Sequence, residues 1–174
     1  SEYGSRSETA LNAFALNHLA DGGRAALLAP SGLLFSGSQF EAKLRQRMVE
    51  ENHLEAIIAL PSDSFQPFSI LQTHLLLVTR TQPDENALTW FLRPAYDGYV
   101  SGRGRDLTQA PQTPNDLTLA EKAVLASRQM VQANGDVPFT IQPLMNRDEV
   151  LGALVKVGDQ ALLVNVRSLP GKKG

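Results

Sequence analysis

The chain has 174 residues, of which 43% are hydrophobic and 20% charged, a balance typical of a globular protein rather than a disordered one. Its formal net charge of -2 excludes a globally basic nucleic-acid binder, so any nucleic-acid contact would have to come from a local patch. The chain has no cysteine, which excludes disulfides, thiolate metal ligands and cysteine nucleophiles. It also has no apolar run of membrane-spanning length and no signal-peptide pattern, so we expect a cytoplasmic protein without a membrane partner.

The first predicted elements are a helix and a strand. Ser5 and Glu8 have the spacing of a capping box, and apolar residues then recur at helical intervals until Gly22 and Gly23 end the pattern. The short apolar run 25–29 follows and is closed by proline. A run of that length with that punctuation is typical of a strand buried on both faces.

A second helix and two more strands are predicted next. Ser38 can cap a helix in which Leu44 and Met48 share one face. The apolar runs 54–60 and 75–78 are typical of buried strands. The segment between them is too short for a crossover helix, so the third strand should run antiparallel to its neighbour. The pattern predicts an α/β fold with a largely covered sheet.

The second half of the chain, from about residue 88, shows a different pattern. Residues 88–92 predict another strand, and the stretch 98–115, rich in glycine and proline, predicts a long loop. Thr118 can cap a helix that ends near Gln132, and strand-like runs on either side of Gly158-Asp159 predict a hairpin. We expect three units: a sheet-containing part at 1–95, the loop at 96–117, and a helix-plus-hairpin extension at 118–174.

Several short patterns occur in an order that resembles the adenine-N6 DNA methyltransferases, and in particular the modification subunits of type I restriction-modification systems. Each pattern alone is weakly specific, whereas their order and spacing are more so. They are residues 19–35, Leu44-Arg45 before 55–61, Phe65 before 73–77, Trp90-Phe91, Asp97-Gly98-Tyr99, and Asn115-Asp116-Leu117.

The resemblance implies the second half of a doubly wound, Rossmann-like methyltransferase sheet, mostly parallel with its last strand antiparallel, followed by a small α+β extension. In that family a glycine-rich first turn binds S-adenosylmethionine, and an Asn-Pro-Pro-Phe-type motif activates the adenine amine. Neither motif occurs in this sequence. We therefore expect S-adenosylmethionine to be the cofactor of the complete protein, no cofactor for this fragment, and no catalytic residue within it.

One wall of the base pocket is expected to remain, because the family places an aromatic ring from the loop between its last two strands against the extruded adenine. Phe65 is the matching position and Phe68 is its rival. Stacking on an extruded base contributes about 1–3 kcal/mol, which orients the base without performing chemistry. The alternative is packing at the sheet edge. The polar context of Phe65 favours stacking, and the apolar context of Phe68 favours packing.

Other candidate residues have weaker support. Arg103 and Arg105 lie in the predicted long loop and could contact DNA phosphates, although loop arginines are more often simply solvated. The three histidines, His18, His53 and His74, lack metal-ligand spacing, so no metal site is expected. The aspartates of the predicted turns, Asp63, Asp97 and Asp116, are expected to bond the local backbone.

The sequence thus favours part of an adenine-specific DNA methyltransferase, inactive as this fragment, with DNA and possible specificity and nuclease subunits as partners of the complete enzyme. The alternative is a non-catalytic protein-interaction module that retains part of the sheet and uses residues 118–166 as its contact surface. A further alternative is another α/β methyltransferase or nucleotide-binding enzyme that shares only the architecture. Half of a doubly wound sheet would also expose a strand edge, so the fragment is expected to self-associate unless its C-terminal segment covers that edge.

Overall fold

The computed structural model describes residues 4–82, 87, 89–100, 105, 114–118, 120–122, 124–125 and 162–164, with the side chains of residues 4–6 and 162–164 excepted. Three predictions fall outside these residues: DNA contact by Arg103, the end of a helix near Gln132, and the turn at Gly158-Asp159. The elements in chain order are α1 (Gly4–His18), β1 (Arg24–Pro30), α2 (Ser31–Phe35), α3 (Gln39–Glu50), β2 (His53–Ala59), β3 (Thr73–Thr79), β4 (Thr89–Leu92) and β5 (Leu162–Val164).

These elements match the runs read from the sequence, with two differences. The first is α2, a five-residue helix that replaces the simple exit turn expected after β1 and buries Leu33 and Leu34. The second is the start of α1. This helix begins at Gly4, so Ser5, the predicted N-cap, lies inside the helix. The predicted cap of α3 is confirmed, since the backbone N–H of Glu41 donates to the Ser38 hydroxyl over 3.5 Å.

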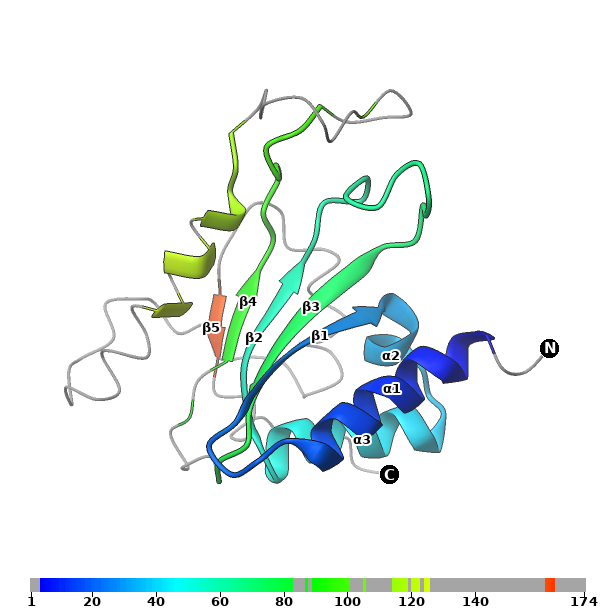
Figure 1. Ribbon diagram of the computed structural model, residues 1–174, viewed down its shortest axis with the longest axis vertical. Helices are drawn as coiled ribbons and strands as arrows, with labels where there is room; N and C mark the ends of the chain where they lie inside the picture. The colour runs from blue at the N-terminus through cyan, green and yellow to red at the C-terminus, as the bar shows by residue number, and fades with distance from the viewer. Residues whose placement is uncertain are drawn as a thin grey trace.

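The strands form one mixed sheet of five in the order β1-β3-β2-β4-β5 (Figure 1). β3 is antiparallel to both β1 and β2, β2 is parallel to β4, and β4 is antiparallel to β5. The antiparallel return of β3 is therefore confirmed. The expected mostly parallel sheet is wrong for these strands, because β3 is inserted between β1 and β2 and converts both of their contacts into antiparallel ones. The fold class is α/β with a mixed sheet.

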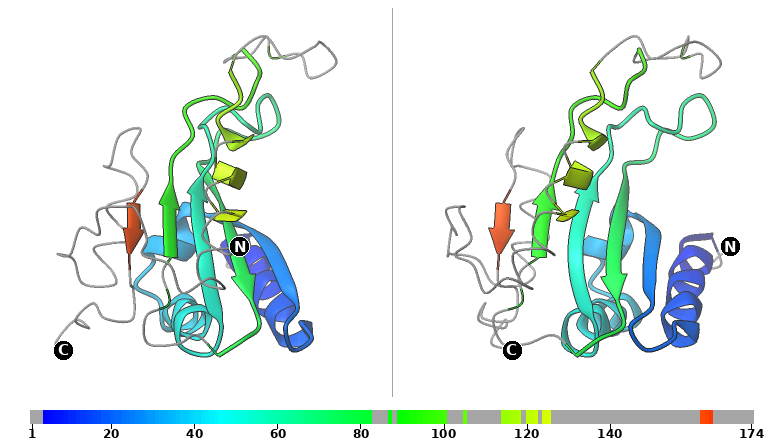
Figure 2. Two further views of the ribbon diagram at one scale, coloured as in Figure 1. Left: turned by 90° about the vertical axis from the view of Figure 1, so that its left-hand side faces the viewer. Right: turned by 60° about the vertical axis from the view of Figure 1, so that its left-hand side comes forward.

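Helices α1, α2 and α3 contribute to the main core on one face of the sheet. Leu16 of α1, Leu33 of α2, and Leu44 and Met48 of α3 pack with apolar residues of β1 to β4. Views from the side place α1 beside β1, and α3 below the strands (Figure 2). Arg45 of α3 fastens α2 to this layer, since its Nη1 and Nη2 donate to the carbonyls of Leu33 (2.7 Å) and Ser36 (2.9 Å).

The second face of the sheet is covered over β2 and β4. Ala120 and Val124, from the helical residues after Asp116, pack there against Ile58, Trp90 and Leu92. This confirms a helix in the region predicted from Thr118. The extension is not separate from the sheet, since β5 joins the edge of β4.

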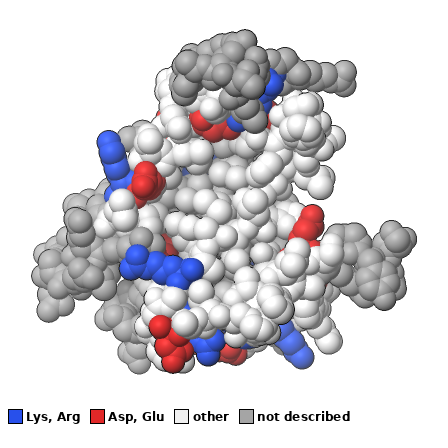
Figure 3. All heavy atoms as spheres, in the orientation of Figure 1, with Lys and Arg blue, Asp and Glu red and all other residues white. Residues whose placement is uncertain are grey.

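On β1 the predicted burial of both faces is wrong. The alternate positions Arg24, Ala26 and Leu28 are exposed, whereas Leu27 and Ala29 are buried. β1 is an edge strand that pairs only with β3 among the described residues, and no described helix buries the face that carries Leu28. In Figure 3 the charged side chains gather toward the ends of the face shown, and its centre is largely uncharged.

Within the described part of the chain, no helix has the length and apolar character needed to cross a membrane.

Candidate functional site

The segment between β2 and β3, residues 60–72, forms a compact loop where β2 ends, and we call it the β2–β3 loop. Its neck is closed by two bonds to the Leu60 and Thr73 backbone: Leu60 N–H donates to Thr73 O (3.1 Å), and Gln72 Nε2 donates to Leu60 O (2.6 Å). Its tip is a series of turns in which Gln66 N–H donates to Asp63 O (2.9 Å) and Phe68 N–H to Phe65 O (2.9 Å). The polar loop predicted here is therefore an ordered structure with its own hydrogen bonds.

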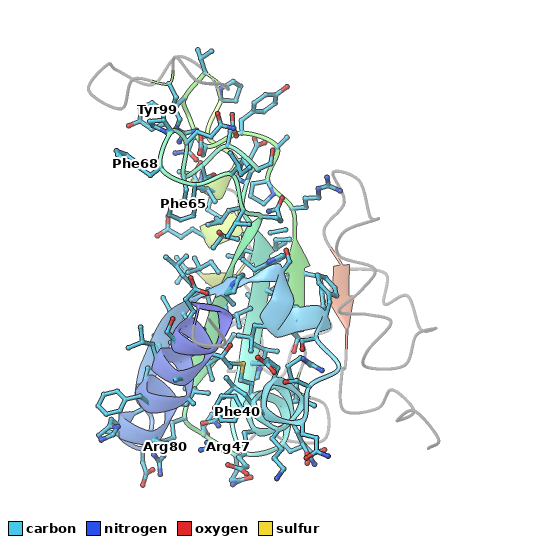
Figure 4. The ribbon with its side chains drawn as sticks, turned by 90° about the vertical axis from the view of Figure 1, so that its right-hand side faces the viewer. Phe40, Arg47, Phe65, Phe68, Arg80 and Tyr99 are labelled. Atoms are coloured by element: carbon cyan, nitrogen blue, oxygen red, sulfur yellow. The ribbon has the colours of Figure 1, made fainter. Side chains whose placement is uncertain are left out.

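The two candidate aromatic residues of this loop differ in exposure. Phe65 is partly buried, whereas Phe68 is 90% exposed and is followed by the exposed Ile70 and Leu71. The interpretation of Phe68 as a packing residue is therefore wrong. Figure 4 shows Phe65, Phe68 and Tyr99 at one end of the molecule, and Phe40, Arg47 and Arg80 at the other. Both rings are available for an aromatic partner, and stacking on a base stays a prediction for each.

A second segment meets the loop at the same end. The two ends of the predicted long loop pair with each other: Asp97 forms a β-bridge with Asn115, and Gly98 N–H donates to Pro114 O (3.1 Å). Asp116 adds a side-chain bond to this frame, since its Oδ2 accepts from the N–H groups of Ala95 and Tyr96 at 3.1 Å each. The turn also needs glycine, because Gly98 has a φ of 95°. Two motifs that lie apart in the sequence thus become one unit.

Asp97 is the centre of a buried polar network that joins this unit to the β2–β3 loop. Its Oδ2 accepts from Arg105 Nη2 (2.6 Å) and from the Ser64 hydroxyl (2.9 Å), and its Oδ1 accepts from Tyr99 N–H (3.4 Å). The side chains of Arg105 and Asp97 are only 4% and 7% exposed. The Arg105 guanidinium also lies over the Tyr99 ring, 5.1 Å from its centroid.

The charge state of Asp97 follows from these contacts. Burial by itself raises the pKa of Asp97, but the hydrogen bonds from Arg105 and Ser64 and the charge of Arg105 together hold it below its ordinary value. Asp97 is therefore a carboxylate at neutral pH. The predicted turn bonding is found at Tyr99, but its contacts to Arg105 and Ser64 were not evident from the sequence, because partners 8 and 33 residues away leave no local pattern.

The structure gives Arg105 a different setting from the one expected. It was expected to be a loop arginine that is either solvated or in contact with a DNA phosphate, and its guanidinium instead faces inward to Asp97. Two of its nitrogens, Nε and Nη1, have no hydrogen-bond partner among the described residues. In this arrangement Arg105 is held away from solvent, so a contact with a DNA phosphate would require the network to open.

His74 is the most strongly perturbed histidine in the described part of the chain. It is 1% exposed on β3, between Ala29 of β1 and Ala59 of β2. Burial lowers the pKa of His74 to about 4, although a hydrogen bond with the Ala29 backbone partly opposes this. His74 is therefore neutral at physiological pH. No group of three potential metal ligands occurs among the described residues.

The opposite end of the sheet carries a polar cavity of about 620 Å³ that was not predicted. Arg47 and Arg80 line it together with Asp21 and Glu51, and each arginine forms an ion pair of 3.0 Å, Arg80 with Asp21 and Arg47 with Glu51. These pairs are largely solvent-exposed, with side-chain exposures of 42% and 96% for the first and 35% and 59% for the second.

Comparison with known proteins gives the family. A family model for N-6 DNA methylase matches residues 4–122. The type I restriction enzyme EcoEI methylase subunit of Escherichia coli is 37% identical over 78 residues, which make up 45% of this chain and 15% of that protein.

Two solved structures are also similar to this chain. The first is a structure that concerns complex assembly and conformational transition of the type I R-M system. It has a TM-score of 0.54 and 19% identity over 95% of this chain and 31% of its own. The methyltransferase subunit of the type I restriction-modification system of Streptococcus thermophilus has a TM-score of 0.41 and 20% identity over 70% of this chain and 23% of its own.

In each of these comparisons the chain spans less than a third of the relative's length. The family match covers more than half of the present chain, from α1 into the helical residues after Asp116. The chain therefore belongs to the N-6 DNA methylase family.

Proposed function

We propose that this chain is part of an S-adenosylmethionine-dependent, adenine-N6 DNA methyltransferase, the modification subunit of a type I restriction-modification system. In this proposal the chain supplies the distal strands of a doubly wound, Rossmann-like sheet and one wall of the pocket for the target adenine. The rest of the subunit supplies the cofactor site and the groups that activate the adenine amine, because the sequence has neither motif. The fragment alone is inactive and binds no S-adenosylmethionine.

The observation that carries the proposal is the placement of Phe65 in an ordered loop at the end of the sheet. Ligands of open α/β sheets bind where the parallel strands end, and the β2–β3 loop begins at that end of β2. Phe65 is only partly buried there, so its ring can stack on an extruded base. Phe68 beside it is freely exposed and is the second candidate for the same contact.

The open edge of β1 supports a sheet that continues beyond this chain. β1 has one unpaired edge within the described residues, and Leu28 on it is 49% exposed. An apolar edge strand of this kind needs a neighbour. We propose that a strand from the rest of the modification subunit pairs there, and that without it the fragment self-associates.

DNA and the specificity and nuclease subunits are the proposed partners of the complete enzyme. Arg103 stays a candidate for a phosphate contact. For Arg105 we propose a structural role in place of direct contact, because its guanidinium is paired with Asp97 inside the protein.

Methyl transfer by the complete modification subunit tests this proposal. Loss of one stacked ring removes about 1–3 kcal/mol, so Phe65→Ala should lower kcat/KM for DNA by about 5- to 150-fold. Fluorescence of 2-aminopurine at the target position should change in parallel. The matched control is Phe40→Ala, since Phe40 is 51% exposed at the opposite end of the molecule. Unchanged kcat/KM and fluorescence for Phe65→Ala would contradict the stacking role.

Calorimetric titration with S-adenosylmethionine tests whether the cofactor site lies outside this chain. The complete subunit should bind the cofactor, and the 174-residue chain should give no binding heat. Tight binding by this chain alone would place the donor site here and overturn the proposal.

One observation favours the alternative of a protein-interaction module. Phe68, Ile70 and Leu71 form an apolar tip on the β2–β3 loop, with exposures of 90%, 82% and 65%. Exposed apolar side chains that cluster in this way often mark a protein interface. If this alternative is correct, Ile70→Ser with Leu71→Ser should abolish binding of the partner protein, and the complete protein should transfer no methyl group to DNA.

A further inference from the structure

The β2–β3 loop is attached to the rest of the protein at two places that differ in kind. At its neck, Leu60, Gln72 and Thr73 form backbone and amide bonds that continue the pairing of β2 with β3. Near its tip, the Ser64 hydroxyl donates a hydrogen bond to Asp97, which lies in another segment of the chain. Ser64 immediately precedes Phe65, so this bond acts on the backbone that carries the ring.

Asp97 is well suited to hold the tip because it is itself held from several sides. Its backbone pairs with Asn115, and Gly98 next to it is bonded to Pro114. Its carboxylate accepts from Arg105 and from Tyr99 N–H. A carboxylate fixed in this way offers Ser64 an acceptor of defined position.

The electrostatics keep this anchor charged. Arg105 compensates the buried charge of Asp97 and donates to it through Nη2 alone, while its planar group lies over Tyr99. A hydroxyl that donates to a carboxylate forms a stronger bond than one that donates to a neutral group. The pair with Arg105 therefore keeps Asp97 ionised as a charged acceptor for Ser64 and fixes the position of that acceptor.

We infer that Asp97 and Arg105 form a buried anchor that positions Phe65 through Ser64, so that the three are positioning residues for base stacking in the proposed methyltransferase. The inference rests on the proposed function for the role of Phe65. It predicts that the motif Asp97-Gly98-Tyr99 acts on the base without touching it.

The first experiment tests the anchor in the complete modification subunit by hydrogen exchange. Ser64→Ala removes only the bond to Asp97 and leaves the ion pair intact, so it preserves the fold. The N–H groups of Gln66, Phe68 and Ser69, which bond within the tip, should exchange about tenfold faster, and those of β3 should not change. Ser64→Thr, which keeps the hydroxyl, should restore protection. Ser62→Ala, in the same loop at an exposed position, is the control.

The second experiment is a double-mutant cycle in the complete modification subunit. If Ser64 acts through Phe65, Ser64→Ala should lower kcat/KM for DNA about tenfold in the wild-type background, equivalent to about 1.4 kcal/mol, and should have little effect in the Phe65→Ala background. KM for S-adenosylmethionine should not change. A purely structural contribution would instead be additive with Phe65→Ala.

The outcomes separate the inference from the proposed function. Unchanged exchange in Ser64→Ala, or additive losses in the cycle, overturns the inference while the methyltransferase assignment stands. A wild-type subunit that transfers no methyl group overturns the proposed function and the positioning role with it. Faster exchange at the tip together with a non-additive cycle supports both.

Discussion

The two ends of the sheet use the same chemical pair, an arginine with a carboxylate, in opposite environments. At the loop end, Arg105 and Asp97 are 4% and 7% exposed and join three separate segments. At the other end, Arg80 and Asp21 are 42% and 96% exposed and line an open polar cavity. Exposed pairs are screened and contribute little, whereas a buried pair makes each partner indispensable to the other. The comparison indicates that the loop end is the part of this protein built to hold a fixed geometry.

The comparison is tested most severely by removing one partner of the buried pair. Asp97→Ala leaves the Arg105 charge buried without compensation, so the free energy of unfolding should fall by about 3–5 kcal/mol, as measured by urea denaturation. Asp97→Ala combined with Arg105→Met leaves no buried charge and should recover much of that loss. A loss no larger than that of Asp21→Ala at the exposed end would contradict the distinction between the two ends.

A change of pH should weaken the loop end through His74. The pKa of His74 is about 4 in the folded chain and about 6.5 in the unfolded one, so the unfolded state binds more protons between these values. The stabilisation is fully present above pH 6.5 and is lost as the pH falls toward 4.

Between pH 7 and pH 5 this effect should lower the free energy of unfolding by about 2 kcal/mol. Thermal or urea melts at the two pH values measure it. In His74→Gln the same pH change should have a much smaller effect, and an equal loss in the variant would exclude His74 as the cause.

The paired frame around Asp97 can be broken at Gly98. Its φ of 95° is unfavourable for any residue with a Cβ atom, so Gly98→Ala should destabilise the chain by about 1–2 kcal/mol. Gly32→Ala is the control, because Gly32 lies in α2 with open space around the position of a Cβ. That control should be neutral or slightly stabilising. Equal melting temperatures for the two variants would show that the turn tolerates a side chain.

The smallest effect is expected at the exposed end. Asp21→Asn removes the charge that pairs with Arg80 but leaves the bond from Arg80 Nη1 to the Leu19 carbonyl (2.8 Å). The free energy of unfolding should change by less than about 1 kcal/mol, and by still less at high salt. A larger effect that persists in salt would mean that this end of the sheet is as tightly organised as the loop end.

The sequence was most informative where structure is local. The runs at 25–29, 54–60 and 75–78 predicted β1, β2 and β3, because a short apolar run closed by proline or a polar loop has few other solutions. The length of the loop between β2 and β3 was enough to predict that β3 returns antiparallel. The exposed face of β1 was missed, because a run of alanines and leucines does not reveal which strand lies at the edge.

The candidate site was predictable only in part. Phe65 was identified from its place in an ordered set of patterns, and its loop is where that order implied. The network around Asp97 was not predicted, because Ser64, Asp97 and Arg105 are far apart in the chain and each has an ordinary polar context. Burial is what gives these residues their importance, and burial of polar residues has no periodic signature.

The position of β3 between β1 and β2 also constrains the order in which the chain can fold. β1 is synthesised first, yet its described partner is β3, and β2 does not pair with it directly. β1 therefore cannot pair with β3 until β3, which ends at Thr79, has been synthesised. Pairing over such a sequence separation is slow and leaves an unpaired strand exposed during synthesis.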